Sequence, residues 1–249
     1  MRAETPSVLL IYTGGTIGMI ENPETGALEN FNFDHLLKHV PELKRFNYRI
    51  SSYQFDPPLD SSDMEPAYWA KLVKIINYNY DYFDGFVILH GTDTMAYTAS
   101  ALSFMLENLS KPVILTGSQL PIGTLRTDGK ENLITAIEIA AAKNPDGTAI
   151  VPEVCIFFEN HLMRGNRTTK AHADGFDAFA SPNLPPLLEA GIHIRRLNTP
   201  PAPHGEGELI VHPITPQPIG VVTIYPGISA DVVRNFLRQP VKALILRSY

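Results

Sequence analysis

Two short segments that combine threonine with glycine are the first candidates for chemistry. YTGGTIG covers residues 12–18 and LHGTDTM covers residues 89–95, and each directly follows an apolar run. A threonine hydroxyl becomes a useful nucleophile only beside a base and a preorganised oxyanion site. In an open α/β sheet, residues just past the carboxyl ends of strands meet in space. Thr16, Thr92 and Asp93 are therefore candidate site residues.

Each segment also has a purely structural interpretation. A glycine pair marks a tight turn, so Gly14 and Gly15 could serve the backbone alone. Thr92 or Asp93 could cap the helix that is expected to follow. Under the functional interpretation, Asp93 holds a substrate ammonium group and Thr92 is a second reactive or water-positioning hydroxyl. The residues alone leave both interpretations open, but the patterns of Walker and Rossmann nucleotide loops are absent from the sequence.

Two further polar stretches supply candidate binding and proton-transfer groups. DSSDM at residues 60–64 could cap a helix, or it could bind a carboxylate through Ser61, Ser62 and nearby amides. Lys170 lies in GNRTTKAHADG, and most lysines are solvated surface charges. A lysine that is desolvated beside a threonine has a lowered pKa and can accept the hydroxyl proton. The eight histidines show no paired ligand spacing, so no metal ion or other cofactor is expected.

The order of the apolar segments predicts which elements position these residues. Buried strands are expected at residues 7–12, 85–90, 112–116 and 154–158, and helices at 34–40, 66–80, 94–106 and 131–143. Strands that alternate with helices predict right-handed βαβ crossovers. The expected fold is therefore α/β, with a mostly parallel sheet flanked by helices in a large N-terminal domain. Residues 20–31, which carry a proline and a glycine, are expected to form a loop.

A proline-rich stretch divides the chain into two expected domains. Prolines accumulate over residues 190–218, which disfavours helix and central strand and indicates a linker. The expected organisation is a catalytic α/β domain at 1–189, the linker at 190–218, and the first βαβ unit of a smaller C-terminal α/β domain at 219–249. One such unit buries too little apolar area to offset its chain entropy. Either it docks on the first domain or, as we favour, the remainder of a second domain lies beyond Tyr249.

Composition excludes several classes of function. The formal net charge is −6 and no Lys/Arg cluster is present, so a nucleic-acid surface is not expected. Cys155 is the single cysteine, which is typical of a chain from a reducing compartment and favours the cytoplasm. The only apolar stretch near the N-terminus, residues 8–11, is too short for a signal peptide or a membrane span. We therefore expect a small-molecule substrate and no membrane partner.

Taken together, the segments resemble bacterial type I, cytoplasmic L-asparaginases. The resemblance rests on YTGGTIG, DSSDM, HGTDTM and RGNRTTKAHADGFDAF, in that order, and it continues through TGSQLP, FASPNLPPL and the terminal ALILRSY. It implies hydrolysis of L-asparagine to L-aspartate and ammonia, with Thr16 forming an acyl-enzyme ester. It also implies that Lys170 and Asp93 tune Thr92.

The resemblance further implies how the substrate is held. Ser61, Ser62 and Asp93 match positions that bind the α-carboxylate and α-ammonium groups, with Thr92 in the same group and Asp60 adjacent. Family members form dimers or larger homo-oligomers, in which the C-terminal domain supplies groups to a partner's active site. Bacterial type I members are also associated with a regulatory asparagine site.

Three positions match that regulatory site, namely Thr169, Arg247 and Ser248. Two departures from the family pattern bear on activity. Many members carry a tyrosine in the flap after the first threonine, where this chain has Ala27, so the base that acts on Thr16 is unassigned. Tyr12 and Tyr53 are the nearest tyrosines in sequence. Family members also continue well beyond Tyr249.

A non-catalytic amino-acid-binding or sensor module is the competing hypothesis. It would keep the binding groups but lack a working base. Another amide or ester is a further alternative for the substrate. The choice between asparagine and glutamine depends on pocket geometry that the sequence does not give.

Overall fold

The computed structural model describes residues 5–21, 28–30, 39–202 and 207–248, in two compact units. The first unit ends at Pro213 and the second begins at Ile214. Each unit is described by itself.

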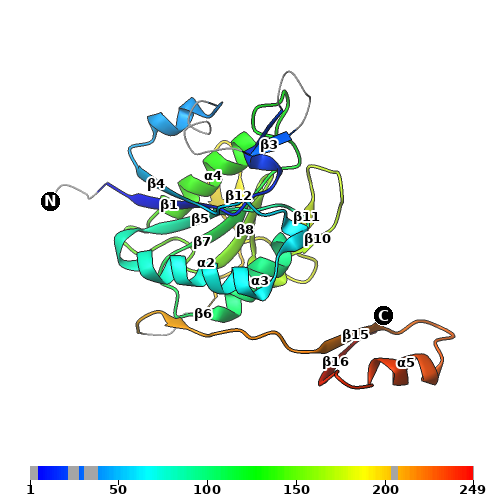
Figure 1. Cartoon of the computed structure of the whole chain (residues 1–249). Helices are drawn as coiled ribbons and strands as arrows, with labels where there is room; N and C mark the ends of the chain where they lie inside the picture. Colours follow the sequence, from blue (N-terminus) through cyan, green and yellow to red (C-terminus); the bar gives the residue numbers. More distant parts are fainter. Residues whose placement is uncertain (1–4, 22–27, 31–38, 203–206, 249) are drawn as a thin grey trace. The chain divides into compact units, whose positions relative to one another are not determined.

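The first unit is built around an eight-stranded sheet with the order β13-β12-β9-β8-β7-β5-β1-β4 (Figure 1). The strands are β1 Ser7–Tyr12, β4 Arg49–Gln54, β5 Gly85–Leu89, β7 Val113–Thr116, β8 Val154–Phe158, β9 His161–Arg164, β12 Leu188–Ala190 and β13 Ile194–Arg196. The run from β4 through β1, β5 and β7 to β8 is parallel, and β9, β12 and β13 continue it with antiparallel pairs. The predicted α/β class with a mostly parallel sheet is confirmed.

Three long helices pack on the two faces of this sheet. They are α2 Pro66–Asn79, α3 Met95–Met105 and α4 Gly129–Ala141. Side chains of alternate β1 residues, Val8 and Leu10, share a core cluster with Leu133 and Ile137 of α4. Helices α2 and α3 contact each other and lie on the opposite face (Figure 1). Apolar burial on both faces explains why the central strands read as continuous apolar runs.

The segment between β1 and β4 differs in part from the prediction. A loop was expected over residues 20–31, but β2 Met19–Glu21 pairs antiparallel with β3 Leu28–Asn30. Most of the helix expected at 34–40 lies outside the described residues, as does the stretch 22–27 with Ala27. Strand β4, which the sequence pattern did not predict, is the edge strand beside β1.

The proline-rich range contains more structure than a linker. Strand β13 lies within residues 190–218 and forms the edge of the main sheet through its pairing with β12. Strand β14, Ile210–Val211, pairs with β6, Leu106–Glu107. Both pairings sit at edges, where a strand needs partners on one side only, so neighbouring prolines are tolerated. The first unit therefore extends to Pro213 rather than ending at residue 189.

The second unit is a βαβ arrangement. Strands β15 Ile219–Thr223 and β16 Ala243–Arg247 pair in parallel, and α5 Ala230–Phe236 connects them. The hydroxyl of Ser229 caps α5 by accepting a hydrogen bond from the Val232 amide at 3.3 Å. Among the described residues of the chain, none of the helices has the length and apolarity that crossing a membrane would require.

Candidate active site

Four loops reach the same edge of the sheet because four neighbouring strands run parallel. Residues 60–63 follow β4, residues 13–16 follow β1, residues 90–93 follow β5, and residues 117–120 follow β7. Because β1 lies between β5 and β4 in the sheet, the loop after β1, which carries Thr16, lies between the loop that carries Thr92 and Asp93 and the loop that carries Ser61 and Ser62. This edge is the position at which open α/β sheets bind ligands.

Close backbone contacts bring three of these loops together. A Cβ atom on Gly15 would lie 2.5 Å from the Gly91 Cα atom, and one on Gly91 would lie 2.6 Å from the Ser61 Cβ atom. The Thr94 hydroxyl donates to the Ser61 carbonyl oxygen at 2.6 Å. Since Thr16 directly follows Gly15, its backbone lies next to the 90–93 turn. The glycines are therefore required for the close approach of the loops and do more than mark turns.

Replacing Gly15 by alanine is expected to lower the free energy of unfolding by more than the same exchange at Gly147. Both residues have positive φ, +93° and +86°, and Gly15, with ψ 168°, lies in a region that essentially only glycine adopts, so alanine there costs at least about 1 kcal/mol of backbone strain. Only at Gly15 would the new Cβ also meet backbone atoms, because nothing lies within 4 Å of a Cβ on Gly147. Urea unfolding of the two variants measures the difference. Equal losses would show that the close contact costs nothing.

Lys170 contacts both candidate residues of the 90–93 turn. Its Nζ atom donates to Thr92 Oγ1 at 2.9 Å and to Asp93 Oδ1 at 2.7 Å. It lies on β10, Thr169–Lys170, which pairs with β11, Phe179–Ala180. The Lys170 side chain is 17% exposed and the Asp93 side chain 67% exposed, so the pair is open to solvent on the aspartate side. An amine, a hydroxyl and a carboxylate thus meet from segments more than 70 residues apart.

Thr16 begins the 3₁₀ turn η1, Thr16–Gly18, and its side chain is half-buried. The turn carries no side-chain cap, and the Thr16 carbonyl accepts the Met19 amide. Ile17, the next residue, is fully buried and its carbonyl oxygen accepts the Ile122 amide at 3.4 Å. The threonine is therefore fixed between a buried neighbour and the Gly15 contact.

The DSSD turn forms η3, Ser61–Asp63, with Asp60 as its cap. Asp60 Oδ1 accepts hydrogen bonds from the Ser62 amide and the Ser62 hydroxyl, both at 2.9 Å. These two bonds lower the pKa of the Asp60 carboxyl, the backbone bond most. Ser61 is buried and packs against Gly91, whereas Asp60 and Ser62 are exposed. Asp60 thus has a clear structural role, and Ser61 is the serine that contacts the neighbouring loop.

The two tyrosines considered for the missing base differ in position. Tyr12 is buried, with its hydroxyl donating to the Gly15 carbonyl oxygen at 3.5 Å and its ring against Gly18. Burial raises its pKa to about 12, so this phenol stays protonated near neutral pH. Tyr53 is 39% exposed on β4 and packs edge-on against Phe55. Tyr12 therefore lies beside the site as a hydrogen-bond donor and not as a resting-state base.

His90 is a buried side chain that the sequence analysis did not single out. Its Nδ1 atom lies 2.7 Å from the Gly91 carbonyl oxygen and its Nε2 atom 2.9 Å from Thr98 Oγ1. A carbonyl only accepts, so Nδ1 carries the proton and Nε2 accepts from Thr98. Thr98 in turn accepts from Trp69 Nε1 at 3.0 Å. This chain of bonds anchors the 90–93 turn to α2 and α3.

Acid is expected to destabilise the protein partly through His90. Burial lowers its pKa from 6.5 to about 4. Between these values the unfolded chain binds more protons than the folded one. The free energy of unfolding therefore falls as pH decreases through this window, by up to about 3 kcal/mol. Urea unfolding at pH 7 and pH 4.5 should show a smaller acid loss for His90→Asn than for wild type, with His193→Gln at an exposed position as the control. An acid loss in His90→Asn equal to that of wild type would refute this.

The three positions matched to a regulatory site are divided between the units. Thr169 is exposed on β10 beside Lys170, in the first unit. Arg247 ends β16 and Ser248 follows it, both exposed, in the second unit.

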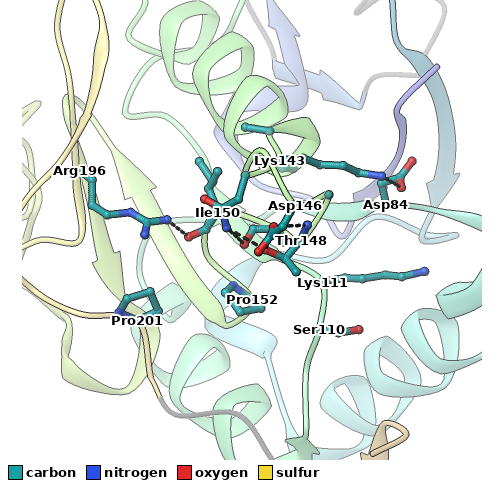
Figure 2. A pocket seen from close by; sticks show the side chains of 15 residues that line it. Asp84, Ser110, Lys111, Lys143, Asp146, Thr148, Ile150, Pro152, Arg196 and Pro201 are labelled. Atoms are coloured by element: carbon teal, nitrogen blue, oxygen red, sulfur yellow. Dashed lines mark hydrogen bonds and ion pairs between the residues drawn. The ribbon is translucent and has the colours of Figure 1, made fainter. Parts of the chain in front are cut away.

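A hollow of about 520 Å³ opens at the opposite edge of the sheet (Figure 2). Its lining includes Asp84, just before β5, and Lys111, just before β7. The cations there are already paired: Lys143 with Asp84 at 2.6 Å, Lys111 with the Tyr80 carbonyl, and Arg196 with the Ile150 carbonyl at 2.5 Å. None of the candidate site residues lines it. Within the described part of the chain, no group of three or more His, Cys, Asp or Glu side chains could hold a metal ion.

A doubly covered α/β sheet with hydroxyls, an amine and a carboxylate at its carboxyl edge is typical of an enzyme that acts on a small polar molecule. The family description "Asparaginase, N-terminal" matches residues 7–202. The chain is 66% identical to L-asparaginase 1 of Escherichia coli K12 over 244 residues, covering 98% of this chain and 70% of that protein. The chain belongs to the asparaginase family.

Solved structures agree with this assignment. The crystal structure of L-asparaginase I from Vibrio cholerae matches with a TM-score of 0.87 and 53% identity, over 97% of this chain and 71% of that one. A probable cytoplasmic L-asparaginase from Campylobacter jejuni matches with a TM-score of 0.79 and 25% identity, over 97% of this chain and 74% of that one. The predicted resemblance is confirmed.

Proposed function

We propose that the protein hydrolyses the side-chain amide of L-asparagine to give L-aspartate and ammonia. Membership of the asparaginase family and 66% identity to an L-asparaginase over nearly the whole chain support this activity. The observation that carries it is the contact of Lys170 with Thr92 and Asp93. That group lies at the same sheet edge as the Thr16 loop, which supports a nucleophile and a proton-handling group that share one substrate position.

Thr16 is the proposed nucleophile. Its Oγ1 atom attacks the side-chain carbonyl carbon, the carbon–nitrogen bond breaks, and the nitrogen leaves as ammonia after it gains the proton that the Thr16 hydroxyl gives up. A water molecule then attacks the resulting ester, aspartate leaves, and the proton of that water returns to the Thr16 oxygen. Dividing one difficult step into two easier ones is the general advantage of covalent catalysis.

Thr92, Lys170 and Asp93 are the proposed second group of the mechanism. The lysine cation lies 2.9 Å from the Thr92 oxygen and 2.7 Å from an oxygen of the Asp93 carboxylate, so it can stabilise negative charge that develops on Thr92 while Asp93 holds it in place. Its side chain is 17% exposed, which limits competition from water. Proton transfer by positioned groups of this kind contributes about 10² to 10⁴ in rate.

The same edge offers complementary charges for a free amino acid. Asp93, with 67% of its side chain exposed, can accept bonds from an α-ammonium group. Ser61 and Ser62 supply hydroxyls for an α-carboxylate, while the Ser62 amide is bonded to Asp60. The Ser62 hydroxyl now donates to Asp60, so it must rotate to donate to the substrate. Asp60 thereby sets the resting orientation of Ser62.

Multiple turnover distinguishes catalysis from binding alone. We expect saturating L-asparagine to yield ammonia and aspartate in equal amounts, many per protein chain. A sensor module would bind L-asparagine, detectable by calorimetry, and release no ammonia. Comparison with L-glutamine under the same conditions measures the side-chain length preference, for which one methylene is worth about 1 to 3 kcal/mol.

We also infer a cytoplasmic location, a homo-oligomer of two or four subunits, and regulation by asparagine, for which Thr169, Arg247 and Ser248 are the candidate positions. The lone, buried Cys155 and the description of the Campylobacter relative as cytoplasmic support the location. Sedimentation measures the subunit number. A sigmoidal saturation curve supports the regulatory site, and a strictly hyperbolic curve refutes it.

A further inference from the structure

Gln119 links Thr92 to the loop that follows Lys170. Its Oε1 atom accepts a hydrogen bond from the Thr92 hydroxyl at 3.2 Å. Its Nε2 atom donates to the carbonyl oxygens of Ala173 at 3.1 Å and Gly175 at 3.0 Å. Because carbonyl oxygens only accept, the amide nitrogen must face that loop and the amide oxygen must face Thr92. The orientation of the side-chain amide is thereby determined.

The backbone of Gln119 is held as well. Its amide donates to both carboxylate oxygens of Asp128, at 2.9 and 3.1 Å, and the Leu120 amide donates to the same carboxylate at 3.2 Å. Asn132 donates to the Gly117 carbonyl oxygen at 3.0 Å. Bonds to an ionised acceptor are stronger than neutral ones. The half-buried side chain therefore extends toward Thr92 from a fixed turn.

The hydrogen-bonding capacity of the Thr92 hydroxyl is divided between two partners. A hydroxyl group has one hydrogen and two lone pairs. Gln119 takes the hydrogen, and Lys170 donates to one lone pair at 2.9 Å. One lone pair remains for a reacting molecule, and its direction follows from the two bonds already made.

We propose that Gln119 is a positioning residue that sets the direction of the Thr92 hydroxyl hydrogen and leaves one lone pair of Thr92 for the reacting water or substrate. The inference rests on the proposed function of Thr92. Gln119 itself transfers no proton. Without it, the hydroxyl rotates among several orientations, and only a fraction of them offers the lone pair in the productive direction.

Two variants separate this role from a purely structural one. Gln119→Met keeps the length of the side chain but removes both the acceptor and the donor. Gln119→Glu keeps an oxygen acceptor for Thr92 but loses the donor to the two carbonyls. We expect kcat for ammonia release to fall about 10-fold in Gln119→Met and less in Gln119→Glu, with KM within about threefold of wild type in both. A role limited to tethering the loop predicts that Gln119→Glu is no better than Gln119→Met.

Thr124→Val is the matched control, because it removes a hydroxyl of the same loop that donates to the nearby Pro121 carbonyl at 2.8 Å. It should retain the wild-type kcat, and thermal unfolding shows that each variant is folded. A kcat of Gln119→Met within about twofold of wild type, or equal rates in the two Gln119 variants, overturns the inference while the proposed function stands. Absence of ammonia release by the wild-type protein overturns both.

Discussion

Replacing Thr16 by valine is expected to lower kcat for ammonia release at least about 10³-fold, since loss of a nucleophile removes the covalent route entirely. Valine has nearly the shape of threonine, so the half-buried position and the 3₁₀ turn are retained. The binding groups Ser61 and Asp93 are untouched, and the dissociation constant for L-aspartate should change by less than about threefold. Steady-state ammonia release and calorimetry give the two quantities.

Thr16→Ser is the matched variant, because it keeps the hydroxyl and loses only a methyl group. Its kcat should be measurable and much higher than that of Thr16→Val. Equal activity in wild type and Thr16→Val would rule out Thr16 as the nucleophile. A large loss of aspartate binding in Thr16→Val would assign the residue to substrate binding.

Replacing Lys170 by methionine is expected to lower kcat about 10² to 10⁴-fold, the range contributed by positioned proton-transfer groups. The cation contacts Thr92 and Asp93 at 2.9 and 2.7 Å and is largely shielded from water. Its removal leaves the Asp93 carboxylate without its partner and the Thr92 oxygen without a donor. A decrease in kcat that exceeds the rise in KM is the expected signature.

Lys143→Met is the control for this variant. Lys143 forms an ion pair of similar length, 2.6 Å with Asp84, but at the opposite edge of the sheet and in the hollow of Figure 2. It should retain the wild-type kcat. If the two lysine variants lost activity to the same extent, the effect would be one of general charge or stability and not of the site.

The central strands and the loops after them could be predicted because an apolar run and the glycines that end it can be recognised within a few neighbouring residues. Residues 8–12 and 86–89 are continuous apolar runs because both faces of the sheet are covered. Strand β4, RISSYQ, escaped prediction because most of its residues are exposed or half-exposed at the sheet edge. The short strand β13 escaped for the same reason.

The site could be predicted only in part. Lys170 was singled out by resemblance, but its contact with Thr92 spans 78 positions and depends on how β10 and β11 fold back. His90, which directly follows β5, and Gln119, in the loop after β7, were missed because a lone histidine or glutamine has no local pattern of its own. The close approach of Gly15 to Gly91 could not be predicted either, because it depends on how the two loops pack against each other in the folded chain.

Trapping the covalent intermediate tests the central claim most directly. The protein is mixed with L-asparagine, quenched in acid within milliseconds to seconds, digested, and analysed by mass spectrometry. We predict one aspartyl group in ester linkage on the peptide that contains Thr16 and its absence in Thr16→Val. An unmodified Thr16 peptide during steady turnover, or an aspartyl group on Thr92 instead, would contradict the assignment.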